Sequence, residues 1–371
     1  MYVAITRRVL ILADKRVLHV LDILSPDSGV ANIVACVSGI ESGIKTIAQD
    51  VVVYGECNEE MEKKIIGTVY KLPHIKESFG KKFSKQFSRL LEEKDYSIVH
   101  GHLLNSAFIY LKEAERQNVN GRIIHAHSAS GADTITKRVR NKILTRTALS
   151  AATDKIAVSP QAGKNAFGSD CEVFENGVDV ERFTFNPDVR KQMRDELGLD
   201  ESIICAGHVG RFAGLKNHRF LLKVFQVMKS RVECRLVLVG DGELKEQILG
   251  IAQERGLAEF ITFTGVREDV ERFYQAFDVF LLPSRSEGFS LAAVEAQCSG
   301  LSCVVSNKVP EIVRCSDNII FLPPDSEEEW ATAAIENAKK PRGTHYAAEA
   351  GLDTETMCRK FSGLYEHILA R

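Results

Sequence analysis

Two carboxylates and two cations in the C-terminal half are spaced as a phosphate and sugar site requires. Glu287 and Glu295 lie eight residues apart, and Arg211 lies five residues before Lys216. An arginine fork can hold one phosphate and a lysine the other, while glutamates can accept hydrogen bonds from sugar hydroxyls. Between the glutamates the pattern predicts a turn and a helix start, whose free backbone N–H groups at residues 289–291 can bind phosphate oxygens. Together these features favour a sugar nucleotide.

Each pattern has an ordinary explanation as well. Arg-x4-Lys is a common surface pattern, and Glu295 alone would be read as a solvent-facing helix residue. A hydrolytic acid/base pair is disfavoured, because both glutamates sit on one turn-helix unit and do not flank a bond from opposite sides.

The positioning elements are alternating strands and helices. The apolar runs predict strands in the first half at 17–24, 50–54, 65–72, 97–100, 122–127, 155–158 and 172–174. After Asn186-Pro187 the alternation restarts, with predicted strands at 203–209, 234–239, 260–263, 279–282, 303–306 and 319–322. We therefore expect an α/β protein of two Rossmann-like, doubly wound domains, 1–185 and 186–353, with the C-terminal helix 354–371 packing back on the first. Ligands of such sheets bind beyond the carboxyl ends of the strands, so two facing domains predict an inter-domain cleft.

Composition supports a large globular enzyme. The chain has 371 residues, a formal net charge of −2 and nine scattered cysteines. The charge gives no reason to expect nucleic acid as a partner. The cysteines form no C-x-x-C pair, which favours free thiols in a reducing cytosol. Arg7-Arg8 and the apolar run after them are too short for a signal peptide, and no apolar stretch is long enough to span a membrane.

Four histidines form two H-x-H pairs at the ends of adjacent predicted strands: His100 and His102, then His125 and His127. Alternation places each pair on one face of the sheet, which could suggest a metal cluster. A metal is disfavoured, because no Asp or Cys joins them and backbone direction is expected to separate the pairs.

Several motifs together resemble the retaining family-4 glycosyltransferases of the GT-B fold. They are the runs 207–212 (GHVGRF), 216–218 (KNH), 240–243 (GDGE) and 287–295, with 28–30 (SGV), 99–102 (VHGH), 124–128 (IHAHS) and 175–179 (ENGVD) in the first half. Within that family, the run 306–313 (SNKVPEIV) looks most like bacterial capsule and exopolysaccharide transferases. The first fifteen residues precede the usual family start, and Ser28-Gly29 stands where the family often has two glycines.

The resemblance implies roles for individual residues. Glu295 would hold the ribose, Glu287 the donor sugar, and Arg211 and Lys216 the diphosphate. The implied donor-binding set is Gly29, Gly210, Arg211, Lys216, Arg267, Glu287, Gly288, Phe289, Ser290, Leu291 and Glu295. The implied catalytic set is His127, Glu287, Arg211 and Lys216, and His102 would lie on the acceptor side.

The implied reaction moves a sugar, with retention of anomeric configuration, from a nucleotide sugar to a glycan or lipid-linked acceptor. UDP is the expected nucleotide. No cofactor is expected, and no metal either, because the chain has no D-x-D triplet to hold one on the diphosphate. We expect the chain in the cytoplasm.

Peripheral contact with the inner face of the cell membrane is also expected. Residues 63–146 carry seventeen Lys and Arg against seven Asp and Glu. The run Lys81-Lys82-Phe83-Ser84-Lys85-Gln86-Phe87 interleaves bases with aromatics, which is typical of helices on anionic lipid, although solvated helix faces are an equal explanation.

Three alternatives remain open at this point. A GT-B epimerase or phosphorylase shares the expected fold and differs in its product. A non-catalytic sugar-nucleotide-binding partner would leave the donor unhydrolysed. A NAD-dependent dehydrogenase is disfavoured, because no G-x-G-x-x-G follows the first strand.

Overall fold

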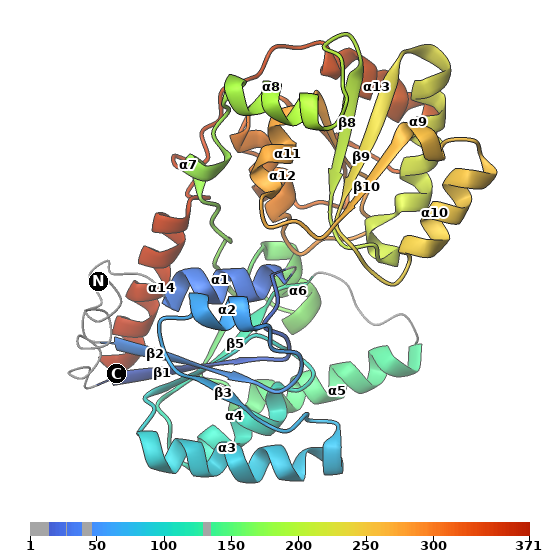
Figure 1. Ribbon diagram of the computed structural model, residues 1–371. Coiled ribbons are helices and arrows are strands. Elements are labelled where there is room, and N and C mark those ends of the chain that lie inside the picture. Colours follow the sequence, from blue (N-terminus) through green and yellow to red (C-terminus); the bar gives the residue numbers. More distant parts are fainter. Residues whose placement is uncertain (1–14, 27, 39–46, 129–134) are drawn as a thin grey trace. The chain divides into compact units, whose positions relative to one another are not determined.

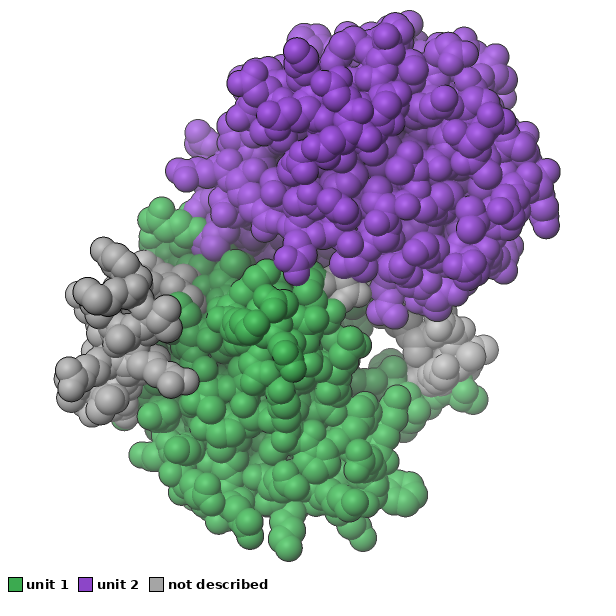
Figure 2. All heavy atoms as spheres, viewed as in Figure 1, with its two compact units in different colours: residues 1–175, 355–371 green, residues 176–354 purple. Residues whose placement is uncertain are grey.

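The computed structural model describes residues 15–26, 28–38, 47–128 and 135–371 (Figure 1). The first fourteen residues, which precede the expected family start, lie outside this part. The chain forms two compact units: unit 1 comprises residues 1–175 and 355–371, and unit 2 comprises residues 176–354. Figure 2 colours unit 1 green and unit 2 purple.

Unit 1 is built on a parallel sheet of seven strands. In chain order they are β1 (Lys15–Leu21), β2 (Ile47–Val53), β3 (Val69–Lys71), β4 (Ile98–Gly101), β5 (Gly121–Ala126), β6 (Asp154–Ala157) and β7 (Glu172–Val173). Their order across the sheet is β3-β2-β1-β4-β5-β6-β7. The strands β2 and β4 are buried along their whole length, as expected where helices cover both faces.

Helices cover both faces of this sheet (Figure 1). On one face lie α3 (Lys81–Lys94), α4 (Ala107–Arg116) and α5 (Ile135–Ala151). On the other lie α1 (Gly29–Ser38), α2 (Glu59–Lys64) and the C-terminal α14 (Thr354–Leu369). The helix α6 (Pro160–Phe167) connects β6 to β7. The apolar side of α14, including Phe361 and Tyr365, packs on the sheet residues Val17, Ile98 and Ile123.

Unit 2 repeats the plan with a six-stranded parallel sheet. Its strands are β8 (Ile204–Val209), β9 (Cys234–Val239), β10 (Ile261–Gly265), β11 (Val279–Leu282), β12 (Ser302–Ser306) and β13 (Ile319–Leu322), in the order β10-β9-β8-β11-β12-β13. One face is covered by α9 (His218–Arg231), α10 (Lys245–Glu254) and α13 (Glu327–Ala338), whose Trp330 is fully buried. The remaining helices are α7 (Val180–Phe183), α8 (Pro187–Glu196), α11 (Val270–Ala276) and α12 (Leu291–Cys298). Short 3-10 turns lie at Glu77–Gly80, Gly214–Lys216, Ala258–Phe260 and Glu311–Val313.

The first chain crossing between the units lies before the expected boundary at 185/186. Residues 176–185 belong to unit 2, because they bond to α11. The Arg182 guanidinium donates to the Glu271 carboxylate at 2.7 Å, and the Gln275 amide donates to the Phe183 carbonyl at 3.4 Å. The return crossing lies beside the first, where Val178 pairs with Asp353.

Strand order reverses once in each sheet, between β1 and β4 in unit 1 and between β8 and β11 in unit 2. In open α/β sheets this reversal opens a crevice at the carboxyl ends of the strands, where ligands bind. The functional residues predicted from the sequence are therefore expected to lie at these two points of strand reversal.

Candidate active site

Lys216 and Glu287 meet at the strand reversal of unit 2. The Lys216 ammonium donates to Glu287 Oε1 at 2.7 Å, and the Ser284 hydroxyl donates to the same oxygen at 2.6 Å. Lys216 follows β8 and Glu287 follows β11, and these strands are neighbours in the sheet. The lysine side chain is 22% exposed and the glutamate 11%, so both keep a narrow opening to solvent.

Backbone contacts bring these two loops together. The Arg285 amide donates to the Leu215 carbonyl at 2.7 Å, and the Asn217 side chain donates to the Pro283 carbonyl at 3.2 Å. The Lys216–Glu287 pair is therefore held by the fold on both sides.

Arg211 lies on a second pair of joined loops. The Phe212 amide donates to the Asp241 carbonyl at 2.8 Å, which ties the loop after β8 to the loop after β9. Gly242 has a φ of +154°, and a Cβ there would lie 2.8 Å from the Phe212 backbone, so this loop contact needs glycine. Among the described residues Arg211 pairs with Glu243 alone, at 3.4 Å, and both side chains are more than half exposed. Such a pair is weak, so the arginine fork is available to a ligand.

Gly210 precedes Arg211 and lies against the lysine. A Cβ at Gly210 would come within 3.4 Å of Lys216 Cε and 3.3 Å of His208 Nε2. The glycine thus lets Lys216 approach the end of β8.

The segment between the two glutamates forms a turn and a capped helix. Ser290 is the N-cap of α12, and its hydroxyl accepts from the Ala293 amide at 3.4 Å. Gly288, Phe289 and Ser290 are buried, while Leu291, the first helical residue, is half-buried. The first turn of a helix leaves backbone N–H groups without intrahelical acceptors, which is the feature that binds phosphate.

Glu295 does not face solvent as its position on a helix alone would suggest. Its Oε2 accepts from the Tyr274 hydroxyl at 2.8 Å, and burial raises the pKa of the Glu295 carboxyl. The nearby Tyr274 hydroxyl also has its pKa raised well above its usual value by burial. Glu295 is therefore oriented by a neutral partner and not by a cation.

Arg267 is already engaged in its own loop. Its Nε and Nη2 atoms each lie 2.9 Å from the Asp269 carboxylate, in a bidentate pair. The side chain is 41% exposed and also lies over the Phe273 ring. It follows β10, two strands further from the reversal point than β8, which Arg211 follows.

In unit 1, Gly29 is the first residue of α1 and is exposed. The Ser28 hydroxyl accepts from the Ala31 amide at 3.3 Å and caps the helix. The helix thus begins at Gly29, directly after its capping residue.

The two histidine pairs do not lie apart, so the expectation that backbone direction separates them was wrong. The strands β4 and β5 are adjacent and parallel, so the pairs face each other. The ring nitrogens of His102 and His127 lie 2.9 Å apart, and those of His100 and His125 lie 3.3 Å apart.

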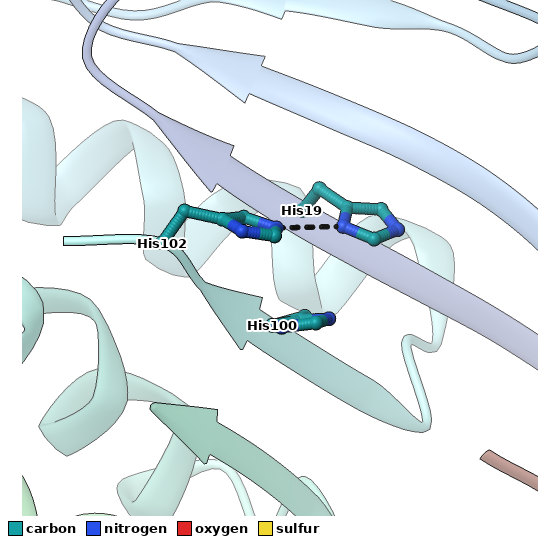
Figure 3. Close-up of side chains that lie close together, drawn as sticks. All are labelled: His19, His100 and His102. Atoms are coloured by element: carbon teal, nitrogen blue, oxygen red, sulfur yellow. Dashed lines mark hydrogen bonds between the residues drawn. The ribbon is translucent and has the colours of Figure 1, made fainter. Parts of the chain in front are cut away.

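A fifth histidine, His19 on β1, was missed. It stands directly opposite His100 in the sheet, and its Nδ1 lies 3.0 Å from His102 Nε2 (Figure 3). The available signal was a lone polar residue inside the apolar run Val17–Leu21. Ring nitrogens of His19, His100 and His102, and of His102, His125 and His127, lie within 4.8 Å of one another.

All five histidines are held neutral by burial. It lowers the pKa of His19 to about 4 and of His127 to about 3. It also lowers the pKa values of His100, His102 and His125 well below their usual range. The strand reversal of unit 1 thus presents uncharged imidazoles.

The predicted lipid-facing aromatics of α3 are instead core residues. Phe83 and Phe87 are fully buried and stack at 5.4 Å between ring centroids. The exposed residues of that run are all polar: Lys81, Lys82, Lys85 and Gln86. Exposed apolar side chains lie on α5 instead, where Val139 and Ile143 are more than half exposed among Arg140, Lys142 and Arg146.

The family described as "Glycosyl transferases group 1" matches residues 203–339. The chain is 31% identical to the putative glycosyltransferase EpsF of Bacillus subtilis (strain 168), over 81% of each chain. The chain belongs to the group 1 glycosyl transferases. Another relative of this glycosyltransferase is the capsular polysaccharide biosynthesis glycosyltransferase CapH of Staphylococcus aureus, with 28% identity over 68% of this chain and 70% of CapH.

Solved structures show the fold of this group 1 glycosyltransferase. The crystal structure of Anabaena Alr3699/HepE in complex with UDP aligns with a TM-score of 0.78 at 17% identity, over 95% of this chain and all of that one. The GT-B fold expected from the sequence is confirmed, with one Rossmann-like sheet in each unit. No helix among the described residues is long and apolar enough to cross a membrane.

Proposed function

We propose that this glycosyltransferase moves a sugar from a UDP-sugar to a glycan or lipid-linked acceptor in the biosynthesis of a surface polysaccharide. The observation that carries the proposal is the Lys216–Glu287 pair at the strand reversal of unit 2, 2.7 Å across and partly open to solvent. CapH, named for capsular polysaccharide biosynthesis, and HepE, solved with UDP, support the substrate class.

The donor roles follow from charge. Lys216 and Arg211 face the diphosphate, where their charges stabilise the negative charge that develops as the phosphate leaves. The amides of residues 288–291 add hydrogen bonds to the phosphate oxygens. Glu295 accepts from the ribose, and Glu287 accepts from the sugar to be transferred.

The remaining candidates complete the donor and acceptor sites. Gly210 allows close approach of backbone to phosphate, and the exposed Gly29 does the same at the start of α1. Arg267 reaches the nucleotide once its contact with Asp269 opens. We assign His127 to the sugar being transferred and His102 to the acceptor side.

The reaction retains the anomeric configuration and needs no divalent metal. The acceptor oxygen forms a bond to the anomeric carbon on the face from which the phosphate departs. As the bond from carbon to phosphate oxygen breaks, the acceptor hydroxyl gives its proton to that phosphate oxygen. Arg211, Lys216 and the start of α12 supply the positive charge that a metal supplies elsewhere.

The chain works at the cytoplasmic face of the membrane, to which the basic surface of unit 1 binds peripherally. The support is the excess of seventeen bases over seven acids in residues 63–146, together with the exposed Val139 and Ile143.

A thermal-shift panel of UDP-, GDP- and ADP-sugars tests the nucleotide, because ligand binding to the folded state raises its melting temperature. UDP-sugars are expected to give the largest shift. Proton NMR of the product, with and without a chelator, then reads the anomeric configuration and the need for metal. A larger shift with GDP- or ADP-sugars contradicts UDP as the nucleotide. An inverted product contradicts retention of configuration, and loss of activity with chelator contradicts the independence of metal.

A further inference from the structure

Three of the histidines of unit 1 form a continuous hydrogen-bonded row that begins at Gln49. Gln49 Oε1 lies 3.0 Å from His19 Nε2, His19 Nδ1 lies 3.0 Å from His102 Nε2, and His102 Nδ1 lies 2.9 Å from His127 Nε2. The ring planes of His19 and His102 are inclined by 18° to each other, and those of His102 and His127 by 30°. The row crosses from β2 through β1 and β4 to the end of β5, and Figure 3 shows its His19–His102 step.

Gln49 fixes the direction of every hydrogen bond in this row. Its amide nitrogen lies 3.0 Å from the Val37 carbonyl, which can only accept, so the amide oxygen must face His19. His19 Nε2 therefore carries the hydrogen. A neutral imidazole has one N–H, so His19 Nδ1 must accept, and the hydrogen between His19 and His102 belongs to His102 Nε2.

The same argument continues to the end of the row. His102 Nδ1 accepts, so His127 Nε2 carries the hydrogen and His127 Nδ1 is left with a lone pair. That nitrogen is buried and has no hydrogen-bond partner among the described residues. Leaving a buried polar atom unpaired is unfavourable, so this atom is poised to accept a hydrogen bond from a ligand.

The argument requires neutral rings, and the surroundings of the row provide them. Burial is the largest effect on all three histidines and lowers their pKa values. The nearest carboxylate, Asp50, raises the pKa of His19 by less than burial lowers it. Asp50 is itself bonded to the Arg16 guanidinium at 3.2 Å and the Tyr96 hydroxyl at 2.7 Å. The other titratable groups that face the row in the described part of the chain are the neutral His100, His125 and Tyr365.

A second row beside the first has no such fixed direction. His100 Nδ1 lies 2.8 Å from the Tyr365 hydroxyl, and His100 Nε2 lies 3.3 Å from His125 Nδ1. A tyrosine hydroxyl can donate or accept, so either direction satisfies this row. It offers a matched control in the same buried cluster.

We propose that Gln49, His19 and His102 are positioning residues that hold His127 as the neutral tautomer with a bare, hydrogen-bond-accepting Nδ1, which binds a hydroxyl of the transferred sugar. A bare nitrogen takes a hydroxyl hydrogen and repels a phosphate oxygen. The location fits, because His127 directly follows the carboxyl end of β5. The identity of the ligand rests on the proposed function, whereas the tautomer does not.

Nitrogen NMR of the whole protein, with 15N-labelled histidine and no ligand, tests the tautomer directly at pH 7. The His127 signals are assigned by their loss in His127→Gln. A protonated Nε2 and an unprotonated Nδ1 on His127, with the same pattern on His19 and His102, are expected. A protonated His127 Nδ1, an imidazolium, or a stoichiometric metal found by elemental analysis of the purified protein overturns the proposal. This measurement needs no transfer activity, so it stands whether or not the proposed function fails.

Two variants test whether Gln49 sets the state of His127. Gln49→Leu removes the acceptor that fixes His19, so a mixture of His127 tautomers is expected. Tyr365→Phe breaks only the second row, so the wild-type pattern of His127 is expected. Circular dichroism checks that each variant folds. If Gln49→Leu does not fold, the tautomer pattern in the nitrogen NMR spectrum of the wild type decides the test. A His127 pattern that is unchanged in a folded Gln49→Leu, or altered in Tyr365→Phe, contradicts the role of Gln49.

Calorimetry tests the ligand, using UDP and the UDP-sugar that gives the largest thermal shift. Gln49→Leu is expected to weaken binding of the UDP-sugar by about two- to tenfold, the worth of one neutral hydrogen bond, and to leave UDP binding unchanged. Equal weakening of both ligands, or of neither, shows that His127 Nδ1 does not accept from the sugar.

Discussion

The two units share one topology and place opposite chemistry at the same point of it. At the strand reversal of unit 2 lie charged, partly exposed groups, with Lys216 and Glu287 paired at 2.7 Å. At the strand reversal of unit 1 lie five imidazoles, four buried and His127 half-buried, that burial keeps neutral. Charged groups suit a diphosphate, and neutral groups with fixed hydrogens suit hydroxyls. On the roles proposed above, the leaving diphosphate is recognised in unit 2, whereas the transferred sugar is recognised by Glu287 of unit 2 and by His127 of unit 1.

The largest expected difference between the units is their response to acid. A histidine whose folded pKa is lowered takes up a proton on unfolding, so its contribution to stability is present above pH 6.5 and is lost as pH falls toward 4. Unit 1 has five such histidines and unit 2 has two, His208 and His218. Each changes stability by up to about 1.4 kcal/mol per pH unit in that window. Unit 1 is therefore expected to unfold first on acidification.

The single tryptophan, Trp330, is buried in unit 2. Its fluorescence therefore reports the unfolding of unit 2 separately from that of unit 1. On titration from pH 7 to pH 4, circular dichroism should fall before Trp330 fluorescence changes. Loss of the Trp330 signal first, or simultaneous loss of both, would contradict the predicted order.

Removing the positive charge of Lys216 in unit 2 is expected to have the next largest effect, on kcat/KM. Lys216→Ala deletes a charge-assisted contact with the diphosphate worth about 1.5 to 3 kcal/mol, so kcat/KM should fall by about 10- to 100-fold. The matched control is Lys223→Ala, which removes an exposed pair with Glu327 on the same unit. Steady-state rates of both variants provide the test, and equal activities for the two would remove Lys216 from the site.

The two glutamates are expected to differ in kind. Glu287→Gln keeps the size of the side chain but loses the charged acceptor for the transferred sugar, so turnover should fall while UDP binds nearly as well as before. Glu295→Gln should weaken UDP itself, by about tenfold, because the ribose is part of UDP. Calorimetry with UDP beside initial rates distinguishes these results. Loss of UDP affinity in Glu287→Gln as large as in Glu295→Gln would show that the division of roles is wrong.

The smallest expected effect concerns the basic surface of unit 1. Because Phe83 and Phe87 are buried, the apolar contact with lipid falls to Val139 and Ile143. Ile143→Asp should reduce pelleting with anionic vesicles by a few fold, and pelleting of the wild type should fall as salt rises. Ile66→Asp, at another partly exposed isoleucine of unit 1, is the control and should pellet like the wild type. Equal pelleting with neutral vesicles would leave the bases as an ordinary solvated surface.

The sequence alone predicted most of the fold and part of the site. Local patterns sufficed for the strands, because β9 and β11 have the predicted bounds. Local patterns could not show which loops meet. The Lys216–Glu287 contact joins residues 71 positions apart and depends on the neighbouring placement of β8 and β11.

The histidines show the same limit more clearly. Their clustering depends on β1, β4 and β5 being adjacent, which sequence periodicity does not report. Phe83 and Phe87 were misjudged for a related reason. Their four-residue spacing marks one helix face, but only the packed sheet decides whether that face meets lipid or core.

The most direct test of this division between the units is calorimetric titration of UDP into the wild type, Glu295→Gln and His127→Gln. If unit 2 holds the nucleotide and the histidines of unit 1 serve the sugar, Glu295→Gln weakens UDP binding by about tenfold and His127→Gln leaves it at the wild-type value. Weaker UDP binding in His127→Gln, with wild-type affinity in Glu295→Gln, would contradict the account.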